Sequence, residues 1–164
     1  MLRRLSLPFL AFVSLALAGC APKSEFRPEE AVNFAGYRRF GVSPFLDPGG
    51  RGQAVTDAFA AALQQTLDDP VDQKALARIL AQYKPDRDVG YRAEELETLR
   101  AQTGADALIV GRMGPGWSSA AITVIELDTG GPILHALLRP RKGKAFASAD
   151  DVAREFLRVY SKLR

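Results

Sequence analysis

The sequence predicts an α+β domain with a mixed sheet of about four to five strands, an antiparallel C-terminal meander and helices packed on the sheet. Residues 105–111, ADALIVG, form a continuous apolar run that is typical of a strand covered on both faces. Residues 117–127 and 133–138 flank the turn sequence DTGG, which predicts a hairpin. Several other segments repeat apolar residues at helical spacing. One sheet with helices packed on it buries all of these apolar faces.

Length and composition fit a single globular domain. The chain has 164 residues, of which 47% are hydrophobic and 25% are charged. This balance excludes collagen, a coiled coil and wholesale disorder, and a formal net charge of +3 is no signature of nucleic-acid binding. The chain contains one Cys and one His, which excludes an intrachain disulfide and the usual Cys/His zinc sites.

Residues 1–19 have the features of a cleaved signal peptide. Arg3 and Arg4 precede an uncharged run over 5–17, which is shorter than the roughly 20 residues of a membrane-spanning helix. Leu17-Ala18-Gly19-Cys20 then resembles the lipobox of bacterial lipoproteins, which implies lipidation of the Cys20 thiol. The alternative is an ordinary secreted protein with an exposed thiol, which is a liability. Ala21 stands where Asp retains enteric-type lipoproteins in the inner membrane. The resemblance therefore implies the inner leaflet of the outer membrane, facing the periplasm.

The remaining chain divides into a tether and one domain. Two prolines and mixed charge over residues 20–35 predict a lipidated Cys followed by a tether. The aromatic and aliphatic residues Phe26, Val32 and Phe34 leave the alternative that part of this segment is attached to the domain. Residues 36–164 are predicted to form a single periplasmic α/β domain.

The first half of the domain predicts a strand followed by helices. Alternation over 37–46 predicts a strand, which ends in the glycine-rich turn of residues 47–52. Apolar residues at i, i+3 and i+4 over 55–67 predict an amphipathic helix. Val71 marks a very short second strand. Asp72 is expected to cap a second helix, and Gly104 to end a third helix.

The second half predicts three strands and a final helix. The strands are expected over 105–111, 117–127 and 133–138, and they are followed by a basic loop over 139–144. Ser148 is expected to open the last helix, with Asp151 three residues later as in a capping box. The apolar stripe of this helix comprises Val152, Phe156, Val159, Tyr160 and Leu163.

Three short motifs resemble a family of bacterial envelope lipoproteins. They are RFGVSPF at 39–45, TGADALIVG at 103–111 and IELDTG at 125–130. The family comprises the curli secretion lipoprotein, the N-terminal domain of the Tol system's periplasmic protein, the Pel export lipoprotein and the activator lipoproteins of penicillin-binding proteins. The resemblance implies an α/β fold and a role in an envelope machine. The loops are too short to supply barrel strands of ~9–11 residues, so a self-made pore is not expected.

No catalytic, cofactor-binding or metal site is predicted. His135 is interpreted as a structural side chain, because no second His or free Cys stands near it. Ser118 and Ser119 lack the last glycine of a nucleophile elbow. The glycine-rich segments 49–52 and 111–116 match neither a P-loop nor a dinucleotide fingerprint and are interpreted as turns. We therefore expect that the chain is not an enzyme.

Two surface features are candidates for contact with a membrane or a partner. Trp117 follows Gly-Pro-Gly at the start of a predicted strand, where it is either exposed or covers the core edge. Arg139, Arg141, Lys142 and Lys144 lie within six residues that contain no acid. Antiparallel pairing of the hairpin brings both features to the same end of the sheet. The alternative for the basic segment is a solvated loop.

These observations predict a lipid-anchored periplasmic adaptor or scaffold subunit of an envelope assembly or export system, for polysaccharide or for fibres. A regulator of a peptidoglycan synthase and a small-ligand-binding lipoprotein are the alternatives. The expected partners are the membrane, through Cys20, and envelope proteins that include further copies of the chain. Nucleic acid is not an expected partner.

Overall fold

The computed structural model describes residues 23–29, 32–66, 69–83 and 91–163, which form an open five-stranded sheet with helices on both faces. The predicted signal peptide and Cys20 lie outside the described residues. The strands are β1 (Glu25–Pro28), β2 (Phe40–Val42), β3 (Ala107–Met113), β4 (Ala120–Glu126) and β5 (Pro132–Leu138). The helices are α1 (Gly52–Thr66), α2 (Gln73–Leu80), α3 (Ala93–Thr103) and α4 (Ala149–Tyr160), with 3-10 turns η1 (Phe34–Gly36) and η2 (Pro115–Trp117).

The strand order β1-β5-β4-β3-β2 makes the sheet mixed. β2 runs parallel to β3, whereas β3, β4, β5 and β1 are successively antiparallel. The parallel pair requires a crossover, and α1, α2 and α3 supply it. The predicted fold class, with its antiparallel meander and packed helices, is confirmed.

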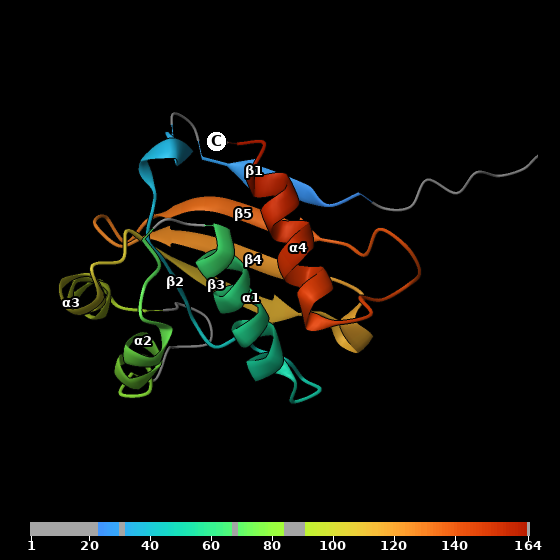
Figure 1. Ribbon diagram of the computed structural model, residues 1–164, viewed down its shortest axis with the longest axis horizontal. Coiled ribbons are helices and arrows are strands. Elements are labelled where there is room, and N and C mark those ends of the chain that lie inside the picture. The colour runs from blue at the N-terminus through green and yellow to red at the C-terminus, as the bar shows by residue number, and fades with distance from the viewer. Residues whose placement is uncertain (1–22, 30–31, 67–68, 84–90, 164) are drawn as a thin grey trace, which may run out of the picture.

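Helices cover the two faces of the sheet unequally (Figure 1). α1 and α4 lie side by side on one face, where Ile109 and Phe59 belong to the larger core cluster. α2 and α3 pack together on the other face at the β2–β3 side, where Leu108 and Leu76 belong to a smaller cluster. Successive β3 residues therefore enter different cores, which explains why the run over 105–111 is apolar without alternation.

The predicted helix caps are present in the structure. The Asp72 carboxylate accepts hydrogen bonds from the backbone N–H groups of Lys74 and Ala75, and the Ser148 hydroxyl accepts one from Asp151. Gly104 ends α3 in the left-handed region, at a φ of 63°, where glycine is favoured. None of the helices among the described residues has the length and apolar character of a membrane span.

Two element predictions differ from the structure. The first domain strand is limited to β2, and only Leu46 rejoins the sheet, through an isolated bridge to Arg112. Val71 lies in no strand. Its side chain is 1% exposed and packs in the smaller core, so burial explains the apolar residue there.

The described part of the predicted tether is attached to the domain. β1 pairs with β5 over four residues, and the ring of Phe26 lies 6.3 Å from that of Phe156 in α4. Phe34 is buried, and Val32 packs against the same core. Residues 25–28 and 32–36 are therefore not a free tether, because their apolar side chains and backbone hydrogen bonds are used by the domain.

Candidate functional site

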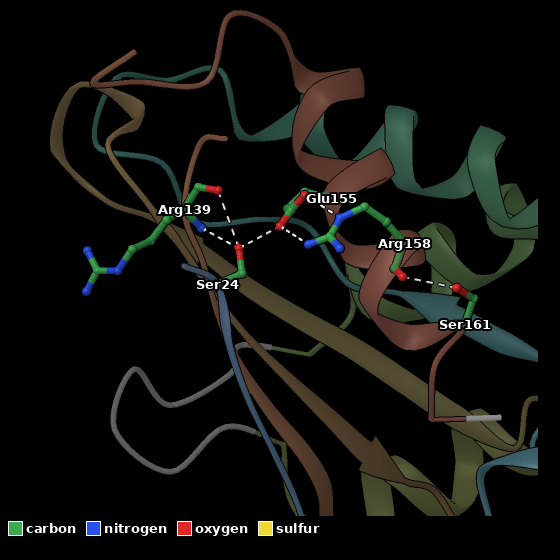
Figure 2. Close-up of polar contacts among 5 residues, drawn as sticks. All are labelled: Ser24, Arg139, Glu155, Arg158 and Ser161. Atoms are coloured by element: carbon green, nitrogen blue, oxygen red, sulfur yellow. Dashed lines mark hydrogen bonds and ion pairs between the residues drawn. The ribbon is translucent and has the colours of Figure 1, made fainter. Parts of the chain in front are cut away.

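The candidate site is centred on Ser24, which fixes the N-terminal segment to the domain (Figure 2). Its hydroxyl donates a hydrogen bond of 2.8 Å to Oε1 of Glu155 in α4. The backbone N–H of Arg139 donates to the same hydroxyl at 3.0 Å, just after β5 ends. The guanidinium of Arg139 points away from Ser24 in the figure. One side chain thus joins the residues that follow Cys20 to a strand end and a helix.

Glu155 is a buried carboxylate, and both of its oxygens accept hydrogen bonds. It is 5% exposed, and Arg158, one turn later, donates from Nε and Nη2 at 3.0 and 2.7 Å. Burial by itself raises the pKa of Glu155, but the hydrogen bonds from Arg158 and Ser24 outweigh it, and the pKa lies below its ordinary value. The carboxylate is therefore ionised at neutral pH and holds Ser24 as a charged acceptor.

A groove of about 1000 Å³ lies beside this junction, between α4 and the loop of residues 139–147. Its charged lining residues are two acids, both from α4, and four cations from the loop and α4. Apolar side chains from both elements form the rest of the wall. The lining residues are Pro140, Arg141, Lys142, Ala145, Phe146, Ala147, Asp151, Arg154, Glu155, Leu157 and Arg158.

The basic loop occupies the surface as the sequence suggests. Arg141, Lys142 and Lys144 are exposed. Arg139 is half-buried, and its backbone is held by Ser24. The loop lies at the Trp117 end of the hairpin, since the backbone N–H of Phe146 donates to the Trp117 carbonyl at 2.9 Å.

Trp117 itself is not an exposed contact residue. Its side chain is 5% exposed and belongs to the larger core. The indole N–H donates to Asp47 at 3.2 Å, and the Arg51 guanidinium lies 4.1 Å from the ring centroid. Trp117 lies in η2, before β4 begins, with a φ of 62°. Of the two alternatives for Trp117, the structure has the one in which the ring covers the core, because this turn directs the ring under Arg51 and into the core.

The opposite end of the sheet carries carboxylates. Tyr37 donates a hydrogen bond of 2.6 Å to Glu126, and the Asp106 carboxylate accepts from the backbone of Arg38 and Arg39. Burial and the hydrogen bond to Glu126 raise the pKa of Tyr37 to about 12. Hydrogen bonds from Tyr37 and Thr129 hold the pKa of Glu126 below its ordinary value. A shallow hollow of about 340 Å³ contains these groups and the Arg100–Asp128 ion pair.

His135 has a local partner. It is exposed on β5, and its Nδ1 lies 3.2 Å from the Thr123 hydroxyl across the strand pair. Within the described ranges, no three His, Cys, Asp or Glu side chains are grouped so that they could hold a metal ion.

The residues of the candidate site that the sequence analysis does not identify are Ser24 and Glu155. A signal for Glu155 was present, because it directly precedes Phe156 and follows Val152 by three positions, on the apolar stripe of α4. A carboxylate on a buried helix face requires a partner. Arg158, at i+3 on the same helix, lies within reach as that partner. Ser24 carried no comparable signal, since its partners are more than a hundred residues away in the sequence.

Comparison with known proteins gives distant structural neighbours. No protein-family profile matches the chain, and no curated protein matches it. A PelC dodecamer from Paraburkholderia phytofirmans aligns with 14% identity and a TM-score of 0.47, over 82% of this chain and 94% of that one. LpoB from E. coli aligns with 12% identity and a TM-score of 0.44, over 63% of this chain and 58% of that one. These values are too low to assign a function, and the family resemblance stays a prediction.

Proposed function

We propose that the chain is a lipid-anchored, non-enzymatic adaptor of the bacterial cell envelope, attached through Cys20 to the periplasmic face of the outer membrane. The observation that supports this most is the position of Ser24, four residues after Cys20 and fixed to both Arg139 and Glu155. Four residues reach at most about 14 Å. An anchor on Cys20 therefore holds the groove and the basic loop next to the lipid surface.

The charge distribution agrees with this orientation. Arg141, Lys142 and Lys144 lie at the Ser24 end of the sheet, where an anionic leaflet attracts them. Asp106, which directly precedes β3, and Glu126, which ends β4, lie at the other end. The anchored domain thus directs its basic end to the membrane and its carboxylate-bearing end into the periplasm, where protein partners are accessible.

The adaptor role is proposed as one of contact with other subunits. The sequence offers one His and one Cys, and lipidation uses the Cys. The single His is engaged with a neighbouring threonine on the sheet. In this proposal the domain is a subunit of an envelope assembly or export system, and it acts by holding partners near the membrane.

Substitution of Cys20 tests the anchor. Cys20→Ala removes the only thiol, so incorporation of radiolabelled palmitate should fall to background, and the chain should leave the outer-membrane fraction or remain as precursor. Lys23→Ala is the matched control, because it alters an exposed residue of the same segment and keeps the lipid attachment residue. Undiminished palmitate labelling of the Cys20→Ala chain would contradict the anchor.

A further inference from the structure

We propose that the groove between α4 and the loop of residues 139–147 binds the phosphate of an anionic phospholipid headgroup, from the leaflet that holds the anchor. This inference rests on the proposed attachment at Cys20. It goes beyond attachment, because it assigns a binding site for a lipid that is not covalently linked to the chain.

The charges of the groove leave cations available for an anion. Glu155 is paired with Arg158, and Asp151 is paired with Arg154. Both carboxylates of the groove are thus neutralised by arginines of their own helix. Across the ranges that the structure describes, no carboxylate lies within ion-pair distance of Arg141 or Lys142. An arriving phosphate therefore meets an excess of positive charge.

The paired arginines also keep exposed donors. The side chain of Arg154 is 71% exposed, and that of Arg158 is 39% exposed. Each guanidinium has five N–H donors, more than its carboxylate partner uses. Arg154 and Arg158 can thus contribute hydrogen bonds to a phosphate without breaking their ion pairs.

The apolar part of the wall favours a lipid over a free anion. Ala145, Ala147 and Leu157 line the groove together with the cations. Leu157 is half-buried and faces this space from α4. Apolar surface beside a cluster of cations suits a phosphate that carries a glycerol and the first carbons of an acyl chain. Inorganic phosphate has no group that would occupy this part of the wall.

The anchor on Cys20 places the groove at the level of the lipid headgroups. Glu155 both lines the groove and accepts the Ser24 hydrogen bond, so the groove adjoins the point where the anchored segment joins the domain. Because Cys20 is within about 14 Å of Ser24 along the chain, the groove lies at the level of the headgroups. The headgroup is thus available without insertion of the domain into the bilayer.

A titration of the mature, lipidated chain tests the site. The chain is purified in neutral detergent micelles, and its mass reports the lipid on Cys20. Dihexanoylphosphatidylglycerol, dihexanoylphosphatidylcholine and inorganic phosphate are then titrated separately and followed by calorimetry. We expect binding of the anionic lipid, with the other two probes at least tenfold weaker.

Charge reversal locates the binding. Arg141→Glu with Lys142→Glu should weaken phosphatidylglycerol binding by at least about 25-fold, since the loss of each cation costs about fivefold near an anionic lipid surface and the reversed charges add repulsion. Lys74→Glu with Arg78→Glu is the matched control, because both residues are exposed on α2, on the other face of the sheet. The control should bind like the original chain. All four side chains are exposed, so thermal unfolding should change little in both variants. The change should be larger in the groove variant, because the charge of Arg141 helps to hold the pKa of Glu155 below its ordinary value.

Each other result overturns the inference. Equal weakening in the control would show a general charge effect without a groove site. Phosphate binding as tight as that of phosphatidylglycerol would exclude the lipid as the occupant, and so would tight binding of the zwitterionic lipid. A chain that carries no lipid by mass refutes the anchor, whereas a lipidated chain that binds none of the probes refutes only the groove.

Discussion

Ser24 is a small residue with a large structural role, because its hydroxyl is shared by two elements that are distant in sequence. It donates to the ionised Glu155 and accepts from the backbone of Arg139. A hydrogen bond to a charged, buried acceptor contributes more than a neutral one. The loss of this hydroxyl leaves one hydrogen-bonding position of a 5%-exposed carboxylate without its partner.

We therefore expect Ser24→Ala to lower the free energy of unfolding by about 1–3 kcal/mol. Chemical denaturation of the mature chain measures this loss. Ser161→Ala is the matched control, because Ser161 also donates from its hydroxyl to a residue of α4, the Arg158 carbonyl, but is exposed. The control should change stability by less than about 0.5 kcal/mol. Equal effects of the two substitutions would contradict the role given to Ser24.

The stability cost of Ser24→Ala should depend on pH, and the pKa of Glu155 determines whether this cost grows or shrinks on acidification. The pKa of Glu155 is lower in the folded chain than its ordinary value of 4.5, so its ionised interactions stabilise the fold above that pH and are lost as pH falls through the folded pKa. The cost of Ser24→Ala should therefore be constant between pH 6 and 8 and should shrink below about pH 4.5. A cost that grows on acidification would show that Ser24 bonds a protonated carboxyl.

Single residues also show where sequence reasoning fails. The four cations of the basic loop can be identified from the sequence, because they lie within six residues that contain no acid. Trp117 was ambiguous, because its environment depends on Asp47 and Arg51, which the chain brings back from an earlier turn. Burial of an aromatic at the end of a strand is decided by such returning segments. Local spacing does not record them.

At the scale of elements, β3 joins the two cores. Ile109 is 0% exposed and faces the core under α1 and α4, and its strand is paired on both sides. Gly111 on the same strand leaves room for Phe45, whose Cε1 would lie 2.0 Å from a Cβ at that position. β3 therefore has little tolerance for polar or larger side chains at its inward positions.

We expect Ile109→Asp to prevent folding. An unpaired carboxylate in this core costs several kcal/mol, against a total stability of about 5–15 kcal/mol. Arg112→Asp is the control on the same strand, because Arg112 is exposed. Circular dichroism and thermal unfolding should show a cooperative transition for the control and none for the core variant. A melting temperature near that of the original chain for Ile109→Asp would place this residue outside the core.

Element ends that depend on contacts within a few residues can be predicted from the sequence, whereas elements that depend on distant partners cannot. Asp72, Gly104 and Ser148 mark helix ends through contacts within a few residues, and these ends were predicted correctly. β1 was not predicted, because its partner β5 lies at the other end of the domain sequence. The short polar sequence of β1, EFRP, has little strand character of its own. Pairing with β5 and contact of Phe26 with α4 make it a strand.

At the scale of the whole molecule, the antiparallel meander gives the domain two different ends, one with the basic loop and one with the carboxylates. β5 runs toward the basic loop, β1 runs away from Ser24, and the turn between β4 and β5 lies at the carboxylate-bearing end (Figure 1). A seven-residue strand is about 23 Å long. The anchored segment, the groove and the basic loop therefore share one end, and the two ends are separated by more than the reach of residues 20–24.

This polarity predicts the orientation of the anchored domain. Because lipidation consumes Cys20, an engineered Cys becomes the single reactive thiol and accepts a fluorophore. Lys144→Cys labels the basic loop, and Gln102→Cys labels the end of α3. Both positions are exposed. In vesicles that contain phosphatidylglycerol and a headgroup-attached quencher, the label at 144 should be quenched several-fold more than the label at 102, which is about 20 Å farther from the membrane.

A soluble quencher supplies the control for this measurement, because it should reach both exposed labels equally when the chain is in detergent micelles. High salt should reduce the difference between the labels in vesicles only in part. Salt screens the attraction of the loop to the lipid, whereas the Ser24 junction still ties this end to the anchor. Equal quenching of the two labels would mean that the domain tumbles freely on its anchor. The proposed orientation, and the position of the groove at the headgroups, would then be wrong.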